Sequence, residues 1–124
     1  MKLIEKAEEA KLSSYSPYSN FKVGAALLTK SGKIYTGCNI ENGAYSPSCC
    51  AERVAFYKAI SEGEQEFEAI AVVGDNEPCY PCGVCRQVMR EFCSDDFKIY
   101  MLENENKIEY TLKEILPYSF ELER

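Results

Sequence analysis

The chain has 124 residues, of which 46% are hydrophobic and 12% aromatic, and this suits one folded domain rather than a disordered or collagen-like chain. The formal net charge of −6 argues against binding to phosphate backbones or anionic membranes, so we expect neither nucleic-acid nor membrane partners. There is no histidine, which excludes Ser-His, Cys-His and His-metal sites and leaves Cys, Glu, Asp, Tyr, Lys and Arg for chemistry.

The hydrophobic pattern predicts helices and strands in alternation. In the first half, the predicted elements are a helix at 2–13, a polar loop at 13–20, a strand at 22–29, a second strand at 33–37 that forms a hairpin with the first, a loop at 39–48 and a helix at 50–61. In the second half, they are a strand at 67–74, a loop at 75–81, a helix around Val84, Val88 and Phe92, strands at 97–102 and 107–111, and a short helix at 112–116.

This order combines a hairpin with strand-helix-strand crossovers, which predicts a mixed sheet covered by helices on both faces. Both faces of residues 67–74 are apolar over most of their length, so this strand should be central. We therefore expect an α/β fold, a three-layer α/β/α sandwich around a mixed five-stranded sheet, in a single domain that spans residues 1–124.

The opening segment and the seven cysteines point to the cytoplasm. Residues 1–25 carry acidic charges without the apolar core of a secretory leader, and no later run approaches the roughly 20 apolar residues of a membrane span. Thiols stay reduced in the cytosol, so an odd number of cysteines fits ligands, nucleophiles or small buried side chains better than a disulfide framework.

Three of the cysteines form a candidate metal site. Cys82 and Cys85 are three positions apart at the expected start of a helix, so their sulfurs can converge on one ion. Cys50 begins the preceding helix, and the partial positive charge of helix N-termini favours thiolates. Three thiolates make a tetrahedral zinc site with one corner open for water, and the carboxylate of Glu52 could take a proton from that water.

The cysteine pattern also admits other interpretations. A C-x-x-C pair in a cytosolic protein occurs in structural zinc sites and in redox pairs. With Cys79 added, the spacing resembles the start of an iron-sulfur run, but the fourth position is Met89. We interpret the remaining cysteines as small buried or loop residues: Cys38, Cys49, Cys79 and Cys93. Cys49 adjoins Cys50, so it could compete for the metal.

Four ordered motifs together resemble one family. They are SPYSNFKVGAAL at 16–27, GCNIEN at 37–42, CAER at 50–53 and PCGVCRQ at 81–87. With these motifs, residues 7–120 resemble the small, homotetrameric, zinc-dependent cytidine deaminases. The resemblance implies a cytidine deaminase-like fold, one Zn²⁺ per subunit and hydrolysis of cytidine and 2′-deoxycytidine to uridine and 2′-deoxyuridine with release of ammonia, a reaction of pyrimidine salvage.

The resemblance also implies roles for individual residues. Cys50, Cys82 and Cys85 match the family's zinc ligands, and Glu52 matches its proton shuttle. The substrate-binding residues that it implies are Phe21 on the pyrimidine, Asn39 and Glu41 on the ribose hydroxyls, the Ala51 N–H on the base carbonyl, and Tyr45 and Phe120 in a neighbouring subunit's pocket. We therefore expect a homotetramer with shared active sites that acts on a small nucleoside.

Two arginines adjoin the metal motifs and one tyrosine departs from the family pattern. Three thiolates on Zn²⁺ sum to −1, and we expect Arg53 and Arg86 to offset this charge by hydrogen-bonding the sulfurs.

Tyr80 stands where a small residue is commoner in the family, which should alter the pocket wall.

Three alternative functions remain at this point. A deaminase for another aminopyrimidine, such as a blasticidin-type antibiotic, would share the fold, although Asn39 and Glu41 favour a ribose. Editing of polynucleotides is disfavoured by the acidity of the chain. A purely structural zinc module would need no Glu52 and would have a closed four-ligand site, with the fourth thiolate from Cys49 or Cys79.

Overall fold

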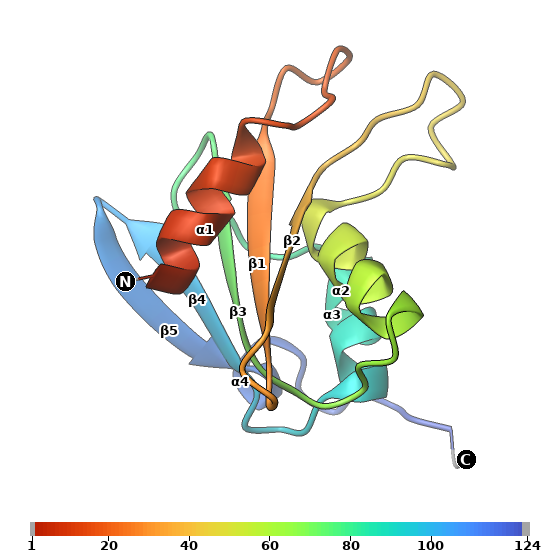
Figure 1. Cartoon of the computed structure of the whole chain (residues 1–124), viewed down its shortest axis with the longest axis vertical. Helices are drawn as coiled ribbons and strands as arrows, with labels where there is room; N and C mark the ends of the chain where they lie inside the picture. The colour runs from red at the N-terminus through yellow and green to blue at the C-terminus, as the bar shows by residue number, and fades with distance from the viewer. Residues whose placement is uncertain (1, 123–124) are drawn as a thin grey trace.

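The computed structural model describes residues 2–122, which form one sheet with helices on both of its faces (Figure 1). The helices are α1 (Lys2–Lys11), α2 (Ala51–Ser61), α3 (Gly83–Phe92) and α4 (Leu112–Ile115). The strands are β1 (Val23–Thr29), β2 (Ile34–Cys38), β3 (Phe67–Gly74), β4 (Lys98–Glu103) and β5 (Asn106–Thr111). None of the helices described is long and apolar enough to cross a membrane.

The sheet has five strands in the order β2-β1-β3-β4-β5. Strands β3 and β4 pair in parallel, and the other neighbours pair antiparallel, so the predicted mixed sheet is confirmed. The central strand is β3, in which every residue from Ala69 to Val73 is buried. Its apolar character on both faces follows from its position between two layers of helix.

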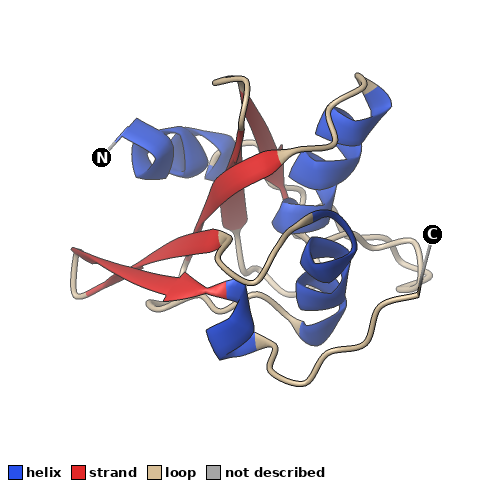
Figure 2. Cartoon of the chain, turned by 90° about the horizontal axis from the view of Figure 1, so that it is seen from below, coloured by secondary structure: helices blue, strands red, loops and turns tan. Residues whose placement is uncertain are grey.

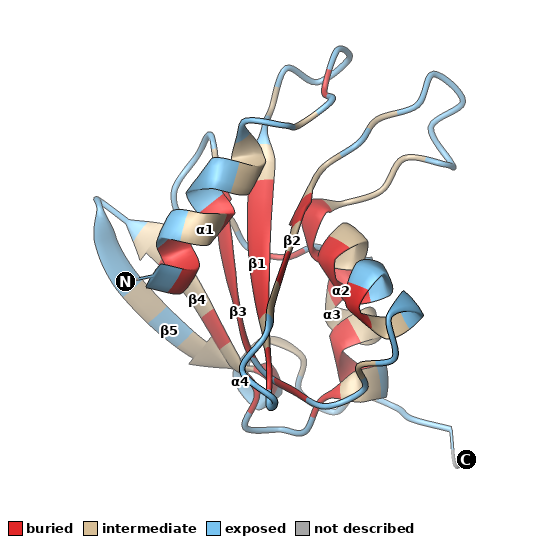
Figure 3. Cartoon of the chain, viewed as in Figure 1, coloured by how far each residue is buried: buried red, intermediate tan, exposed pale blue. Residues whose placement is uncertain are grey.

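The two faces of the sheet carry separate hydrophobic clusters, which confirms the three-layer sandwich (Figures 2 and 3). On one face α1 is the helix that covers the sheet within residues 2–122, and the buried residues of this cluster are Leu3, Ile4, Ala7, Ala26, Ala69, Ala71 and Val73. On the other face α2, α3 and α4 cover a larger core that includes Phe56, Ile70, Met89, Ile99 and Leu112. Three aromatic rings surround Phe56 in that core, at centroid distances of 5.1 to 6.5 Å: Phe67, Phe92 and Phe97.

The predicted helix boundaries are wrong by one or two residues at places that matter for the site. Helix α1 ends at Lys11, and the next three amides form tighter turns with carbonyls three residues back. Helix α2 begins at Ala51 and helix α3 at Gly83, so that Cys50 and Cys82 are the extended N-cap residues. Both cysteines therefore directly precede their helices, at the helix N-termini.

Two glycines allow the helix backbones to lie directly on the sheet. A Cβ at Gly24 would stand 2.0 Å from the carbonyl oxygen of Ala7 in α1. A Cβ at Gly37 would stand 2.4 Å from the carbonyl oxygen of Ala51 in α2. Any side chain at Gly37 would push the start of α2 away from the sheet, and this helix start carries Cys50 and Glu52.

We expect Gly37→Ala to lower the free energy of unfolding by about 1–3 kcal/mol, because a methyl group in a filled space forces the backbone to shift. Chemical denaturation at saturating zinc measures the change. The matched control is Gly83→Ala, because no atom lies within 4 Å of a Cβ there. Its stability should stay the same or rise by up to about 1 kcal/mol. Equal stability of the two variants would contradict the close-packing argument.

Candidate active site

Loops from three parts of the chain meet at the end of the sheet where β1 begins and β2 and β3 end (Figure 1). The loop after α1 is joined to the loop after β2 through a bridge between Tyr15 and Ile40. A second bridge joins Ile40 to Cys49 at the approach to α2. The start of β1 is joined to the end of β3 by a hydrogen bond from the Asp75 amide to the Lys22 carbonyl, 3.1 Å long. These connections hold the start of α2 beside the strand ends.

The sulfurs of Cys50, Cys82 and Cys85 converge at these helix starts. The Cys50 and Cys82 sulfurs are 3.7 Å apart and the Cys82 and Cys85 sulfurs 3.4 Å apart, and all three lie within 4.8 Å of one another. The Cys82 sulfur also accepts a hydrogen bond of 3.4 Å from the Cys85 amide, which fixes it as the cap of α3. The two helix starts thus bring together three sulfur donors from two distant parts of the sequence.

The donor set fits a zinc ion. Hydrogen bonds from Cys85, Arg53 and Cys82 lower the pKa of Cys50 to about 5, whereas the hydrogen bond to Cys50 and burial raise the pKa of Cys85. Three thiols packed this closely cannot all ionise unless a cation balances them, and zinc is the divalent ion that prefers thiolates in such a cluster. Within residues 2–122, no fourth cysteine or carboxylate joins the group. This disfavours the closed four-thiolate site of a structural module.

The two arginines expected to contact the sulfurs differ. Arg53 donates from Nη2 to the Cys50 sulfur at 3.4 Å, as expected. The Arg86 guanidinium instead donates from Nε to the Pro81 carbonyl at 2.8 Å and from Nη1 to the Ile115 carbonyl at 2.7 Å. Ile115 ends α4, and the last carbonyls of a helix have no donor within the helix, so they attract the arginine. Arg86 therefore ties α3 to α4 and the loop that carries Cys82.

Glu52 is a buried carboxyl group in the first turn of α2, with 4% of its surface exposed. Burial, reinforced by the negative charge of Cys50, raises its pKa to about 7. A carboxyl group with this pKa can both accept and release a proton at neutral pH. This is the property that a proton shuttle needs.

A cavity of about 200 Å³ lies in front of Glu52. Its lining residues are Phe21, Val23, Asn39, Cys50, Ala51, Glu52, Cys79, Tyr80 and Cys82. Six of the residues singled out for the metal, the substrate or proton transfer thus share one cavity, and Tyr80 forms part of the wall, as expected. Val23 and Cys79 had not been singled out as wall residues, because an apolar strand start and a loop cysteine carry no signal for a pocket.

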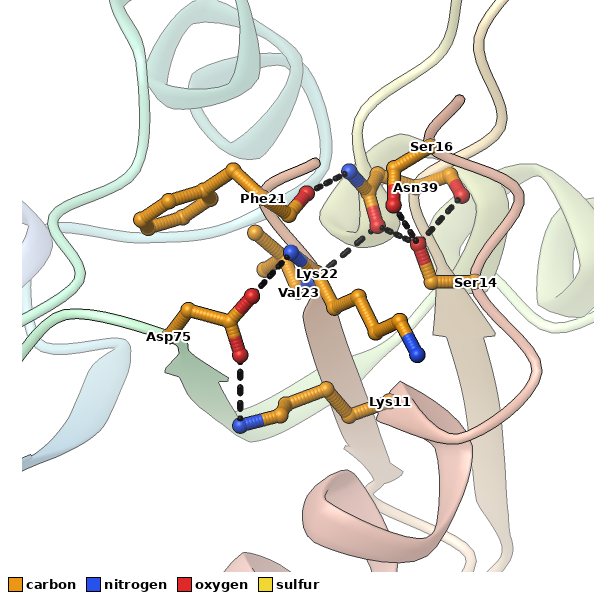
Figure 4. Close-up of polar contacts among 8 residues, drawn as sticks. All are labelled: Lys11, Ser14, Ser16, Phe21, Lys22, Val23, Asn39 and Asp75. Carbon is orange, nitrogen blue, oxygen red and sulfur yellow. Dashed lines mark hydrogen bonds and ion pairs between the residues drawn. The ribbon is translucent and has the colours of Figure 1, made fainter. Parts of the chain in front are cut away.

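The Asn39 side chain is the centre of a hydrogen-bond network beside the cavity (Figure 4). Its Nδ2 donates to the Phe21 carbonyl at 2.7 Å, and its Oδ1 accepts from the Val23 amide at 2.9 Å. The hydroxyl of Ser14 also donates to Oδ1. The sequence patterns did not point to Ser14, because a serine in a polar loop has no distinguishing neighbour.

Glu41 and Tyr45 lie in a different groove, of about 340 Å³, on the loop after β2. The Glu41 carboxylate accepts hydrogen bonds from the Tyr18 and Ser19 amides at 3.0 and 3.1 Å and from the Ser19 hydroxyl. These bonds, the one from the Ser19 hydroxyl foremost, lower the pKa of Glu41, so it is a carboxylate at neutral pH. Tyr45 is 75% exposed.

Phe120 lies away from the cavity of its own chain. It is 66% exposed and lines an apolar hollow of about 460 Å³ beside α2 and α3. Its carbonyl accepts a hydrogen bond of 3.3 Å from the Gln87 side chain. Within residues 2–122, the aromatic ring of Phe120 therefore contributes to a surface and not to the pocket that holds Glu52.

Comparison with known proteins agrees with this geometry. Residues 1–101 match the family model described as the cytidine and deoxycytidylate deaminase zinc-binding region. The chain is 51% identical to the cytidine deaminase of Sporosarcina psychrophila, over 98% of this chain and 91% of that protein. It is 50% identical to the cytidine deaminase of Halalkalibacterium halodurans, over 98% of this chain and 93% of that protein.

A solved structure shows the same fold. The crystal structure of cytidine deaminase from Burkholderia pseudomallei has a TM-score of 0.91 and 44% sequence identity, with 96% of this chain and 97% of that chain covered. Since the family model spans most of the chain and relatives share half of its residues, the chain belongs to the cytidine and deoxycytidylate deaminase family of zinc-binding proteins.

Proposed function

We propose that this chain is a zinc-dependent hydrolase that converts cytidine and 2′-deoxycytidine to uridine and 2′-deoxyuridine and releases ammonia. The observation that carries the proposal is the buried Glu52 carboxyl, which shares one small cavity with the cysteine cluster. The cytidine deaminases named above, which match this chain over nearly its whole length, support the same reaction. The salvage of pyrimidine nucleosides is the process that this reaction serves.

Cys50, Cys82 and Cys85 would hold one zinc ion per subunit. When bound, zinc lowers the pKa of a water molecule and so supplies a nucleophile at neutral pH. The contact of Arg53 with the Cys50 sulfur supports a role for its positive charge in offsetting the thiolates.

Glu52 is the proton carrier in this mechanism. It takes one proton from the attacking water, whose oxygen bonds to C4 of the pyrimidine, and delivers this proton to N3. It then takes the remaining proton from the same oxygen, now a hydroxyl group on C4, and delivers it to the amino group on C4. The C4–N bond then breaks and ammonia leaves. A carboxyl group with a pKa of about 7 suits both the uptake and the delivery of a proton, because at neutral pH its protonated and ionised forms are similarly populated.

The remaining lining residues would position the nucleoside. Phe21 offers a flat apolar wall for the base, and the Ala51 amide would bind the base carbonyl, because the first amides of a helix have no acceptor within the helix. Asn39 uses one amide N–H internally and keeps the second for a ribose hydroxyl. From the neighbouring groove, Glu41 would accept a hydrogen bond from a second hydroxyl through Oε2, which accepts from the Ser19 hydroxyl and so has one acceptor site left, whereas Oε1 already accepts from two amides.

We further propose that the protein assembles as a homotetramer with shared active sites. Tyr45 and Phe120 are aromatic residues outside the cavity of their own chain, and each leaves most of its apolar side chain exposed to solvent. A neighbouring subunit would bury them and use them to complete its pocket. The whole chain, residues 1–124, would act as one deaminase domain in the cytoplasm, where its seven thiols stay reduced.

We expect Glu52→Gln to lower kcat for cytidine by about 10²–10⁴-fold, because the amide cannot carry the proton. Zinc per chain, measured by mass spectrometry of the metal, should be unchanged. The matched control is Glu66→Gln, since Glu66 is exposed on the loop before β3, and it should have normal activity. A near-normal rate for Glu52→Gln would refute the role of Glu52.

Shared sites predict complementation between two defective variants. Phe120→Ala should raise KM for cytidine, and its hybrids with Glu52→Gln should regain activity, because a subunit with an intact Glu52 receives Phe120 from its neighbour. Co-expression of the two variants, followed by light scattering and a deamination assay, tests this. Fully active protein with a monomeric mass would contradict the tetramer.

A further inference from the structure

The short segment from Phe21 to Val23 is held by its backbone from two sides (Figure 4). On the β2 side, Asn39 binds the Phe21 carbonyl and the Val23 amide through its side chain and the Val23 carbonyl through its own amide, which is 3.2 Å away. On the β3 side, Asp75 binds the backbone amide and the backbone carbonyl of Lys22. Every backbone N–H and C=O group from the Phe21 carbonyl to the Val23 carbonyl therefore has a hydrogen-bond partner.

Asp75 binds the Lys22 backbone through two groups, its side-chain carboxylate and its backbone amide. The Asp75 carboxylate accepts a hydrogen bond of 2.7 Å from the Lys22 amide through Oδ2. The Asp75 amide donates to the Lys22 carbonyl at 3.1 Å. The carboxylate bond is shorter than a typical amide-to-oxygen bond, as expected when the acceptor is charged.

Lys11, at the end of α1, holds the Asp75 side chain in this orientation. Its ammonium lies 3.1 Å from Oδ1, the oxygen that does not bind Lys22. The two side chains are 28% and 36% exposed, so the pair is partly shielded from water. The hydrogen bond from Lys22 first, and Lys11 second, lower the pKa of Asp75, so it is ionised at neutral pH.

The Phe21 ring lines the cavity and lies next to the clamp, by which we mean Asp75, Lys11 and the Lys22 peptide groups that Asp75 binds. A Cβ added at Gly74, the residue before Asp75, would lie 3.2 Å from Cε1 of Phe21 and 2.7 Å from the Cys79 sulfur. The ring therefore packs against the end of β3 and the cavity wall, and Gly74 makes room for it. Asp75 itself does not line the cavity, so any effect on substrate passes through Lys22 and Phe21.

We propose that Asp75, oriented by Lys11, is a positioning residue that fixes the Lys22 peptide and thereby holds the Phe21 ring at the distance that a pyrimidine needs. This inference rests on the proposed deaminase function. The clamp acts on binding of the base rather than on the proton transfers, because within residues 2–122 its hydrogen bonds and its ion pair join Asp75 to Lys11 and to the Lys22 backbone, and not to Glu52 or the three clustered cysteines. Loss of the clamp should therefore weaken substrate binding and leave the chemical step nearly intact.

We expect Asp75→Ala to raise KM for cytidine by about tenfold while kcat stays within about twofold. Asp75→Asn should recover most of the affinity, since its amide oxygen can still accept from Lys22. Lys11→Met, which removes only the ion pair, should raise KM by about threefold. The matched control is Glu109→Ala, which breaks a comparable pair with Lys98 at 3.0 Å far from the cavity and should leave KM unchanged.

Hydrogen exchange of the Lys22 amide, measured by NMR on the zinc-loaded protein without substrate, gives a second readout. Exchange should be faster in Asp75→Ala and Lys11→Met and unchanged in Glu109→Ala. An unaltered KM together with unaltered exchange in Lys11→Met would overturn the inference, even if Asp75→Ala fails to fold. A fall in kcat as large as the rise in KM would also overturn it. Absence of turnover by the unsubstituted protein would instead contradict the proposed function.

Discussion

The convergence of two helix starts on one point at the end of the sheet is the constraint on which the site depends. Cys50 and Cys82 cap α2 and α3, and Cys85 lies one turn into α3, so three sulfurs meet within 4.8 Å. Helix N-termini favour thiolates, and thiolates this close favour a divalent cation. Two features of the fold place the helix starts together. Helix α3 is the crossover between the parallel strands β3 and β4, and helix α2 packs closely on β2.

The burial of Glu52 follows from the same arrangement. Because Glu52 is two residues after a cysteine cap, it turns inward in the first turn of α2 and loses contact with water. Burial raises its pKa toward neutrality, so the packing that holds the metal ligands also prepares the proton carrier. Gly37 lets α2 lie close enough to the sheet for both effects, which links a strand residue to the chemistry of a helix start.

Sequence patterns predicted the sheet, the layers and the cysteine cluster, because each depends on local spacing: apolar periodicity for the elements and a C-x-x-C pair at a helix start. They failed for Arg86, whose partner Ile115 is distant in the sequence and is brought near only by the docking of α4. They gave no sign of Asp75, since a loop aspartate acquires its role only when Lys11 and Lys22 lie on either side of it. The roles of Tyr45 and Phe120 depend on another subunit, so they stay predictions.

The most direct test of the account is the loss of cytidine absorbance on mixing with the purified protein, together with metal analysis of the same sample. The account predicts turnover to uridine and ammonia with about one zinc per chain, since the one cluster of three cysteines in residues 2–122 would hold one ion. Zinc without turnover of cytidine would contradict the assigned reaction. Turnover that persists in full after the zinc has been removed would contradict the role of the cysteine cluster.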